Sequence, residues 1–153
     1  MFEVNIYIET EVKGPARRRG WYASVLEFLK DGKAITREDY VLEEETTYHR
    51  SVLRALINSL KRLNTNCYVN IYTDSDYLKN SIENFLPQWK NTGFVNAKGK
   101  PLENQKEWME VAKLIAGQKV KFRKTARHCY TEAMQKEARK RFVDNGVENV
   151  EKL

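Results

Sequence analysis

Three strand-like segments follow one another before any helix-like segment begins, and this order constrains the fold more than any other feature of the sequence. Val4–Glu9, Trp21–Leu29 and Ala34–Glu43 are rich in the β-branched and aromatic residues that favour strands. Asp31 and Gly32, between the second and third segments, form a typical hairpin turn. We therefore predict that the chain opens with antiparallel strands joined by short connections.

The remainder of the chain alternates between helix-like and strand-like segments. We expect a helix capped by Thr46 or Thr47, a strand over Cys67–Thr73, a short helix from Asp74 to Ile82, a helix over Asn104–Ile115, a strand over Val120–Lys124 and a helix over Thr131–Phe142. The first helix carries an apolar stripe at helical spacing, formed by Val52, Leu53, Leu56, Ile57 and Leu60. This order predicts an α/β fold with a five-stranded mixed sheet flanked by helices. We expect one domain over residues 1–143 and a polar tail over residues 144–153.

Charge and cysteine content narrow the class of function. The 153-residue chain has 27 Lys and Arg against 21 Asp and Glu, a net charge of +6, which favours nucleic acid as a partner. A basic solvated surface is the competing interpretation. Cys67 and Cys129 lack the spacing of a zinc site or a disulfide framework, and no apolar run approaches the roughly 20 residues of a membrane span. We expect a cytoplasmic monomer that does not contact a membrane.

Three segments of the sequence resemble the type 1 ribonuclease H family. The stretch VNIYIETEVKGPARRRGWYASVLEF is similar to its opening hairpin, and TTYHRSVLRALINSLKRL to its first helix. The stretch VNIYTDSDYLKNSI is similar to its strand, D-S-x-Y turn and following helix. The match continues without a gap from Thr46 to Trp108, so the resemblance implies the ribonuclease H-like fold.

The resemblance implies two-metal hydrolysis of a phosphodiester, with Mg²⁺ or Mn²⁺ ions about 4 Å apart. The family holds its ions with four carboxylates, whose positions fall on Glu9, Val52, Asp74 and Gln135. Glu9 is one methylene longer than the usual Asp, Val52 has no ligating atom, and Gln135 is neutral. Two of four carboxylates are thus missing, which predicts one weak ion at most, between Glu9 and Asp74.

Other acidic residues are candidates to replace the missing ligands. Glu132 lies three residues before Gln135 on the same predicted helix, and Glu11 lies two residues after Glu9. Glu43–Glu45 precede the first helix. For each, a solvated surface position is the competing interpretation. His128 stands near the place of the family's catalytic-loop histidine, and the sequence leaves its role open.

The residues that bind the duplex in this family are distinct from those that hold metal. By resemblance the start of the first helix, the first hairpin loop and a basic protrusion contact nucleic acid. The candidates in this chain are Arg17, Arg18, Arg19, Thr47, Tyr48, His49, Trp89, Lys90, Lys98 and Asn104. Capping by Thr47, packing by Trp89 and a solvated arginine loop over Arg17–Gly20 are the competing interpretations.

These observations favour a nucleic-acid-binding domain, for an RNA/DNA hybrid or double-stranded RNA, with impaired or absent nuclease activity. The alternative is a divergent Mg²⁺-dependent ribonuclease H that cleaves the RNA strand of hybrids. A protein-interaction scaffold is a third interpretation, and the net charge and the Arg17–Arg19 cluster count against it. Mg²⁺ or Mn²⁺ is expected as a cofactor only if the chain is active.

Overall fold

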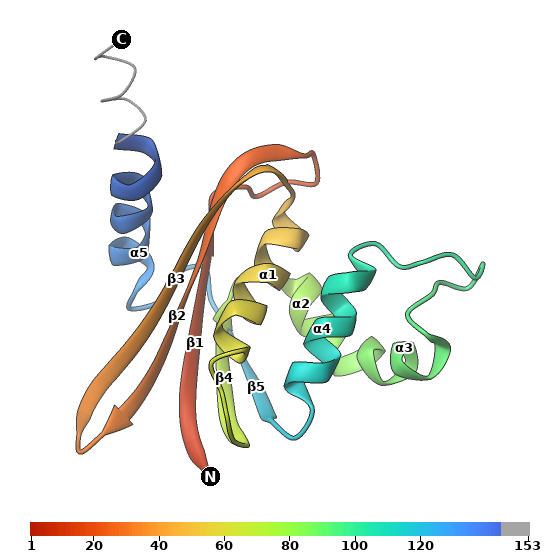
Figure 1. The fold of residues 1–153 in the computed structure, drawn as a ribbon, viewed down its shortest axis with the longest axis horizontal. Helices are drawn as coiled ribbons and strands as arrows, with labels where there is room; N and C mark the ends of the chain where they lie inside the picture. Colours follow the sequence, from red (N-terminus) through yellow and green to blue (C-terminus); the bar gives the residue numbers. More distant parts are fainter. Residues whose placement is uncertain (145–153) are drawn as a thin grey trace.

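A single mixed sheet organises the computed structural model, which describes residues 1–144 (Figure 1). Its strands, in chain order, are β1 (Phe2–Thr10), β2 (Arg18–Lys30), β3 (Lys33–Thr46), β4 (Cys67–Thr73) and β5 (Lys119–Lys124). They lie side by side in the order β3-β2-β1-β4-β5. β1 pairs antiparallel with β2 and β2 with β3, whereas β4 runs parallel to β1 and β5 parallel to β4. The predicted α/β fold with a five-stranded mixed sheet is confirmed.

Helices cover both faces of the sheet. They are α1 (Tyr48–Leu60), α2 (Asp76–Asn80), the π-helical turn η1 (Ser81–Phe85), α3 (Leu86–Thr92), α4 (Gln105–Ile115), α5 (Thr131–Ala138) and the π-helical turn η2 (Arg139–Asp144). α1 packs on β1 and β2, and α4 packs on α1, while α5 lies against β1 and β2 from the opposite face (Figure 1). None of the helices formed by residues 1–144 has the length and apolar character needed to cross a lipid bilayer.

Alternating side chains on β1 divide the core into two layers. Val4, Ile6 and Ile8 belong to the larger cluster beneath α1 and α4, whereas Tyr7 belongs to the smaller cluster beneath α5. Glu9 follows Tyr7 by two residues, so the same alternation directs its side chain toward the α5 face. The strand pattern therefore decides which helix Glu9 can meet.

The first basic segment differs from the expectation. Arg18–Gly20 were expected in a loop, but they open β2, where Arg18 pairs with Thr46 and Gly20 with Glu43 of β3. The register of the pairing between β2 and β3 shifts between Arg18 and Gly20, which marks a β-bulge. Through this bulge β2 continues beyond its regular pairing with β3. Of this segment only Arg17 remains in the connection before β2.

The later element boundaries follow the expectation with small extensions. Thr47, one of the two expected residues, caps α1, and the helix expected to end at Ile82 continues through η1 into α3. Pro87 lies in the first turn of α3, a position that proline occupies often. The proposed boundary between residues 143 and 144 stays a prediction, and residues 145–153 of the expected tail lie outside the described part of the chain.

Candidate functional site

The parallel pairing of β1 and β4 brings Glu9 and Asp74 to the same edge of the sheet. Tyr7 pairs with Tyr72, so the residues two positions further along each chain are Glu9 and Asp74. Asp74 follows the last residue of β4, and Ser75 caps α2 by accepting a hydrogen bond from the Leu78 amide at 3.0 Å. A strand that ends against a capped helix thus positions Asp74.

Glu9 is buried, and its carboxylate is held by the segment that leads into α5. Its Oε2 accepts a hydrogen bond from Thr131 Oγ1 at 3.1 Å and lies 3.0 Å from His128 Nε2. The Tyr130 amide donates to His128 Nδ1 at 3.2 Å, so a neutral His128 ring carries its hydrogen on Nε2, facing Glu9. The His128 side chain is only 2% exposed. The structure therefore places His128, whose role the sequence left open, directly on Glu9.

Asp74 is exposed and receives its partners from two other segments. The Tyr48 hydroxyl donates to Oδ1, and Lys13 Nζ lies 3.9 Å from Oδ2. Burial, followed by the hydrogen bond to Asp74, raises the pKa of Tyr48 far above its ordinary value. Tyr48 therefore remains a hydrogen donor at any pH at which the protein works.

The two positions without a carboxylate differ in their surroundings. Val52 is 1% exposed and packs in the core beneath α1, in the apolar stripe where the sequence placed it. Gln135 is exposed on α5, where it and Glu132 line a shallow cavity of about 440 Å³ among basic residues. The cavity is completed by Arg127, Lys136 and Arg139. Glu132 thus shares one surface with Gln135, and that surface is basic.

The other candidate acids have partners of their own. The Trp21 amide donates to Glu11 Oε1 at 3.1 Å, which fastens Glu11 to β2. Glu43 accepts hydrogen bonds from Tyr22 at 2.6 Å and from Arg54 at 2.5 Å. Both acids therefore serve local structure.

The remaining acids near this edge form exposed ion pairs. Asp76 Oδ1 lies 2.7 Å from Lys124 Nζ. Glu44 lies 3.5 Å from Arg19 and Glu45 lies 3.9 Å from Arg17. Exposed pairs of this kind contribute about 0–1 kcal/mol each, so they set local charge more than stability.

The donor set at this edge does not fit the two divalent ions that the resemblance implies. Among residues 1–144 no three His, Cys, Asp or Glu side chains come close enough together to hold a metal ion. Glu9 Oε2 and Asp74 Oδ1 already accept hydrogen bonds, so an ion at these oxygens would compete with the donors. A site with near-octahedral demand needs several free anionic oxygens, which the described residues do not supply.

The start of α1 carries the first group of expected duplex-binding residues. Thr47 caps the helix by accepting a hydrogen bond from the Arg50 amide at 3.2 Å, so its expected capping role is present. His49 stacks on Tyr77, with ring centroids 3.7 Å apart. Burial lowers the pKa of His49, and the charge of Glu103 acts in the opposite direction. His49 is therefore neutral at physiological pH.

Aromatic contacts connect α1 to the segment over residues 86–104, which we call the α3–α4 arm. Trp108 Nε1 donates to the Tyr77 hydroxyl at 2.7 Å, and the Trp108 ring lies 5.2 Å from that of Trp89. Asn104 occupies the N-cap position of α4 without a capping hydrogen bond from its side chain, and its φ of 59° is a conformation that Asn tolerates better than most residues. A cavity of about 750 Å³ opens beside these rings, lined in part by Tyr77, Phe85, Trp89 and Leu102.

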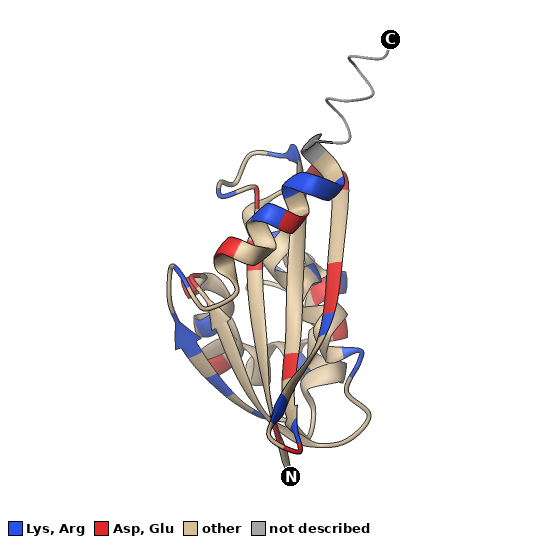
Figure 2. Ribbon diagram, turned by 90° about the vertical axis from the view of Figure 1, so that its left-hand side faces the viewer, with Lys and Arg blue, Asp and Glu red and all other residues tan. Residues whose placement is uncertain are grey.

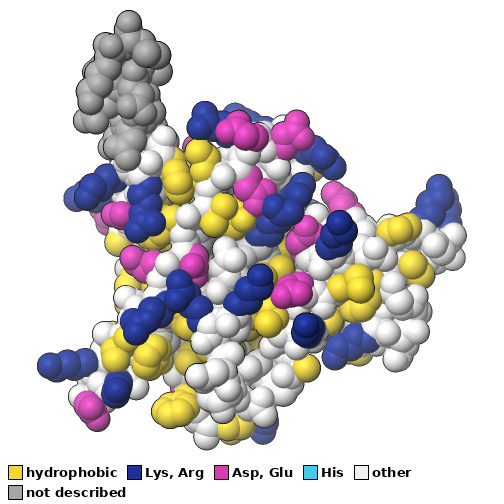
Figure 3. All heavy atoms as spheres, viewed as in Figure 1, with side chains coloured by type: hydrophobic (Ala, Val, Ile, Leu, Met, Phe, Trp, Pro, Cys, Tyr) yellow, Lys and Arg dark blue, Asp and Glu magenta, His cyan; other side chains and the backbone are white. Residues whose placement is uncertain are grey.

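Lysines at the surface of the α3–α4 arm have no acidic partner in the described part of the chain, unlike Lys13, Lys79 and Lys124. Lys90, Lys98 and Lys100 are exposed, and none of them forms an ion pair within residues 1–144. Basic side chains stand at the tip of the arm, the part of the molecule furthest to the right in Figure 3. The arm therefore presents uncompensated positive charge beside half-buried aromatic rings.

The arginines of the Arg17–Arg19 cluster differ in whether they have acidic partners. Arg17 and Arg19 face Glu45 and Glu44, whereas Arg18 has no acidic partner in the described part of the chain. Acidic and basic residues also both occur along α5, as the colours of the ribbon in Figure 2 show. The cluster thus offers less free charge than three consecutive arginines suggest.

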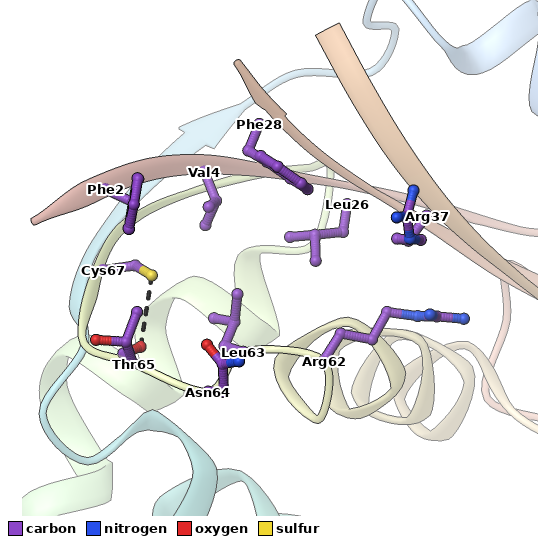
Figure 4. Close-up of a pocket in the computed structure, with 10 residues that line it drawn as sticks. All are labelled: Phe2, Val4, Leu26, Phe28, Arg37, Arg62, Leu63, Asn64, Thr65 and Cys67. Atoms are coloured by element: carbon purple, nitrogen blue, oxygen red, sulfur yellow. Dashed lines mark hydrogen bonds between the residues drawn. The ribbon is translucent and has the colours of Figure 1, made fainter. Parts of the chain in front are cut away.

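A further cavity lies at the opposite end of β1, remote from Glu9. It has a volume of about 450 Å³ between the sheet and the end of α1 (Figure 4). Phe2, Val4, Leu26 and Phe28 form its apolar wall, and Arg37 and Arg62 stand at one end. Phe2 lies at the start of β1 and Glu9 near its end. The cavity is therefore separate from the end of the sheet where Glu9 and Asp74 lie, which we call the carboxylate edge.

Comparisons with known proteins agree with this fold. The family described as RNase H matches residues 3–145. A ribonuclease H of Wolbachia sp. subsp. Drosophila simulans is 31% identical over 145 residues, which cover 93% of this chain and 97% of that protein. The crystal structure of LC9-RNase H1, described as a type 1 RNase H with the type 2 active-site motif, matches with a TM-score of 0.69 and 24% identity. That match covers 84% of this chain and 65% of the other.

A second solved structure, the foamy viral protease-reverse transcriptase in complex with an RNA/DNA hybrid, matches with a TM-score of 0.66 and 19% identity. The match covers 88% of this chain and 18% of the viral one. At these identities the two solved structures support the fold alone.

Proposed function

This chain belongs to the ribonuclease H family, and we propose that it binds nucleic-acid duplexes while its nuclease activity is weak or absent. One observation carries the proposal. Each remaining carboxylate of the family's set receives donors from this chain, whereas the lysines of the α3–α4 arm have no acidic partner within residues 1–144. These contacts support weak metal binding at the edge, and the unpaired lysines support phosphate binding on the arm.

The proposed duplex-binding surface runs from the start of α1 to the arm. Contacts among His49, Tyr77, Trp108 and Trp89 join these regions into one continuous aromatic layer. Exposed lysines at its far end suit phosphate contact, and aromatic faces suit stacking and sugar contact. Tyr48, Thr47, Asn104 and Arg17–Arg19 complete the set of proposed contacts.

We propose an RNA/DNA hybrid as the first ligand to test, with double-stranded RNA as the second. The fold is shared with a viral enzyme whose structure contains an RNA/DNA hybrid, which supports this order. The wide minor groove of a duplex that contains RNA presents 2′-hydroxyl groups to polar side chains such as those at the start of α1.

An active, divergent ribonuclease H is the second candidate, and one observation favours it. β1 and β4 bring Glu9 and Asp74 to one edge, with Glu132 beside Gln135 on α5, so a single divalent ion has conceivable ligands. In that case Mg²⁺ or Mn²⁺ would be the cofactor, as the family is generally dependent on divalent metal ions.

The deciding experiment incubates the purified chain with a labelled hybrid in Mg²⁺ or Mn²⁺ and measures binding and cleavage on the same samples. We expect a salt-sensitive complex and no cleavage above that of an Asp74→Asn control. Cleavage that the Asp74→Asn substitution abolishes would establish the active enzyme. A signal that is absent, or independent of salt, would remove the nucleic-acid function altogether.

A further inference from the structure

The connection between β1 and β2 is held in place by its backbone. The Glu11 amide donates to the Trp21 carbonyl at 2.9 Å, and the Tyr48 amide donates to the Gly14 carbonyl at 3.0 Å. Val12, between these two anchors, is 4% exposed, and its carbonyl accepts a hydrogen bond from Thr10 Oγ1. Lys13 therefore extends from a fixed backbone position.

Gly20 makes room for this path. A Cβ atom at position 20 would lie 2.4 Å from Val12 Cγ2, closer than real side chains approach. Because Val12 is buried, it has little freedom to retreat. Glycine at position 20 thus lets the connection lie close against β2.

The side chain of Lys13 is directed toward Asp74. Its Nζ lies 3.9 Å from Asp74 Oδ2 and 5.8 Å from the centroid of the Tyr48 ring, which is within the range of a cation–π contact. The Tyr48 hydroxyl meanwhile donates to Oδ1. One oxygen of Asp74 faces an ammonium group and the other accepts a hydrogen bond, so this chain supplies both a counter-charge and a hydrogen-bond donor to the carboxylate.

We propose that Lys13, assisted by Tyr48, replaces a divalent cation as the counter-charge of Asp74 and makes duplex binding at this edge independent of metal. The part that concerns duplex binding rests on the proposed function, whereas the competition with metal does not. A cation at Asp74 would have to displace the ammonium from Oδ2 and the hydroxyl from Oδ1. An uncompensated Asp74 would repel a phosphate strand, and Lys13 removes this repulsion without an ion.

An ordinary exposed ion pair is the simpler interpretation. The Lys13 and Asp74 side chains are 55% and 41% exposed, and such pairs contribute little to stability. The two interpretations differ in what they predict for duplex binding, because loss of a mere surface pair would not make hybrid affinity depend on Mg²⁺.

Metal affinity is measured first, on the free protein, by following Mn²⁺ binding with electron paramagnetic resonance. We expect Lys13→Met to bind Mn²⁺ about 5- to 10-fold more tightly than the unsubstituted chain, since it vacates Oδ2 and removes one positive charge from the edge. Tyr48→Phe should increase the affinity as well. Lys33→Met, which makes the same charge change at the β2–β3 hairpin, should behave like the unsubstituted chain. Equal affinities for Lys13→Met and Lys33→Met would overturn the proposal.

Duplex binding is measured second, in EDTA and in Mg²⁺ at matched ionic strength. We expect the affinity of the unsubstituted chain for a hybrid to change by less than about twofold, and that of Lys13→Met to fall by about 3- to 10-fold in EDTA and recover in Mg²⁺. A requirement for Mg²⁺ in the unsubstituted chain would overturn the proposal. If no variant binds a hybrid, the proposed function fails, and the Mn²⁺ measurement still decides whether Lys13 competes with metal.

Discussion

The carboxylate edge and the α3–α4 arm lie on one molecule but treat their charges in opposite ways. At the edge, Glu9 contacts His128 and Thr131, and Asp74 contacts Tyr48 and Lys13. On the arm, exposed lysines stand without acidic partners within residues 1–144. The carboxylates of the edge have hydrogen-bond donors or a lysine from this chain, whereas the lysines of the arm have no such partners in the described part of the chain.

The comparison shows that the contacts of a charged side chain indicate whether it can bind a ligand better than the residue type does. Glu9 and Asp74 keep carboxylates that metal chemistry needs, but Glu9 Oε2 and both oxygens of Asp74 already face donors from this chain. The lysines of the arm keep no special spacing, yet their charge is free to release counterions from a phosphate backbone.

The largest expected effect is a loss of stability when a carboxylate is introduced at position 52. Val52→Glu would restore a carboxylate at the missing position, but it places a charge in the core beneath α1, where Val52 is 1% exposed. We expect the free energy of unfolding to fall by about 3–5 kcal/mol, the typical cost of an unpaired buried charge. Urea denaturation measures this change, with Val52→Ala as the reference for lost packing, at about 1–3 kcal/mol. A smaller loss for Glu than for Ala would mean that position 52 opens onto the carboxylate edge.

The next largest effect is a loss of hybrid affinity when the unpaired lysines of the α3–α4 arm are replaced. We expect replacement of Lys90, Lys98 and Lys100 by Gln to weaken hybrid binding by about 10- to 100-fold and to reduce the slope of affinity against salt by about 2 to 3. Fluorescence anisotropy over a range of salt concentrations measures both quantities. Replacing Lys30, Lys33 and Lys61 by Gln makes the same change in net charge elsewhere on the molecule. If both triple variants lose equal affinity, net charge and not the arm attracts the duplex.

A smaller effect is expected when two arginines of the Arg17–Arg19 cluster lose their acidic partners. Glu44→Gln with Glu45→Gln removes the acidic partners of Arg19 and Arg17, which are exposed pairs at 3.5 and 3.9 Å. We expect hybrid affinity at low salt to rise by about 2- to 5-fold, and the free energy of unfolding to change by less than about 0.5 kcal/mol. An unchanged affinity in the same anisotropy assay would show that these arginines do not face the duplex.

The smallest effect lies where the two regions meet, at His49. Burial lowers its pKa from the ordinary value of 6.5, so folding favours the neutral imidazole. The contribution of His49 to stability is full above pH 6.5 and is lost as the pH falls through that value toward the lower pKa of the folded state. Titration by NMR should show a midpoint below 6.5, and Tyr77→Ala should move it back toward 6.5. A midpoint at or above 6.5 in the unsubstituted chain would contradict the stacked, buried environment.

The fold could be predicted because its signals are local. The apolar stripe of α1 repeats at helical spacing, so the burial of Val52 followed from its neighbours in sequence. The mixed sheet, with its first three strands antiparallel, followed from the succession of strands and from the resemblance. Arg18–Gly20 misled the prediction because pairing with β3, a contact between distant segments, extended β2 into a stretch whose composition is typical of a loop.

The partners of the carboxylates could not be predicted in the same way. Thr131 and Glu9 are 122 positions apart, and only the packing of α5 on β1 brings them together. Lys13 meets Asp74 because backbone hydrogen bonds fix the β1–β2 connection. Neither contact has a spacing or a motif that a single sequence displays, whereas the candidates for duplex binding rested on the resemblance and stay predictions.

Gly20 has a consequence for how this chain can vary. Its missing side chain lets Val12 pack against β2, and Val12 precedes the lysine that faces Asp74. A substitution at position 20 would therefore shift a charge at a site that position 20 does not touch. Variation at position 20 of β2 is therefore coupled to the charges at the carboxylate edge. Adding one methyl group there can change how the molecule binds ions, although no charged residue is replaced.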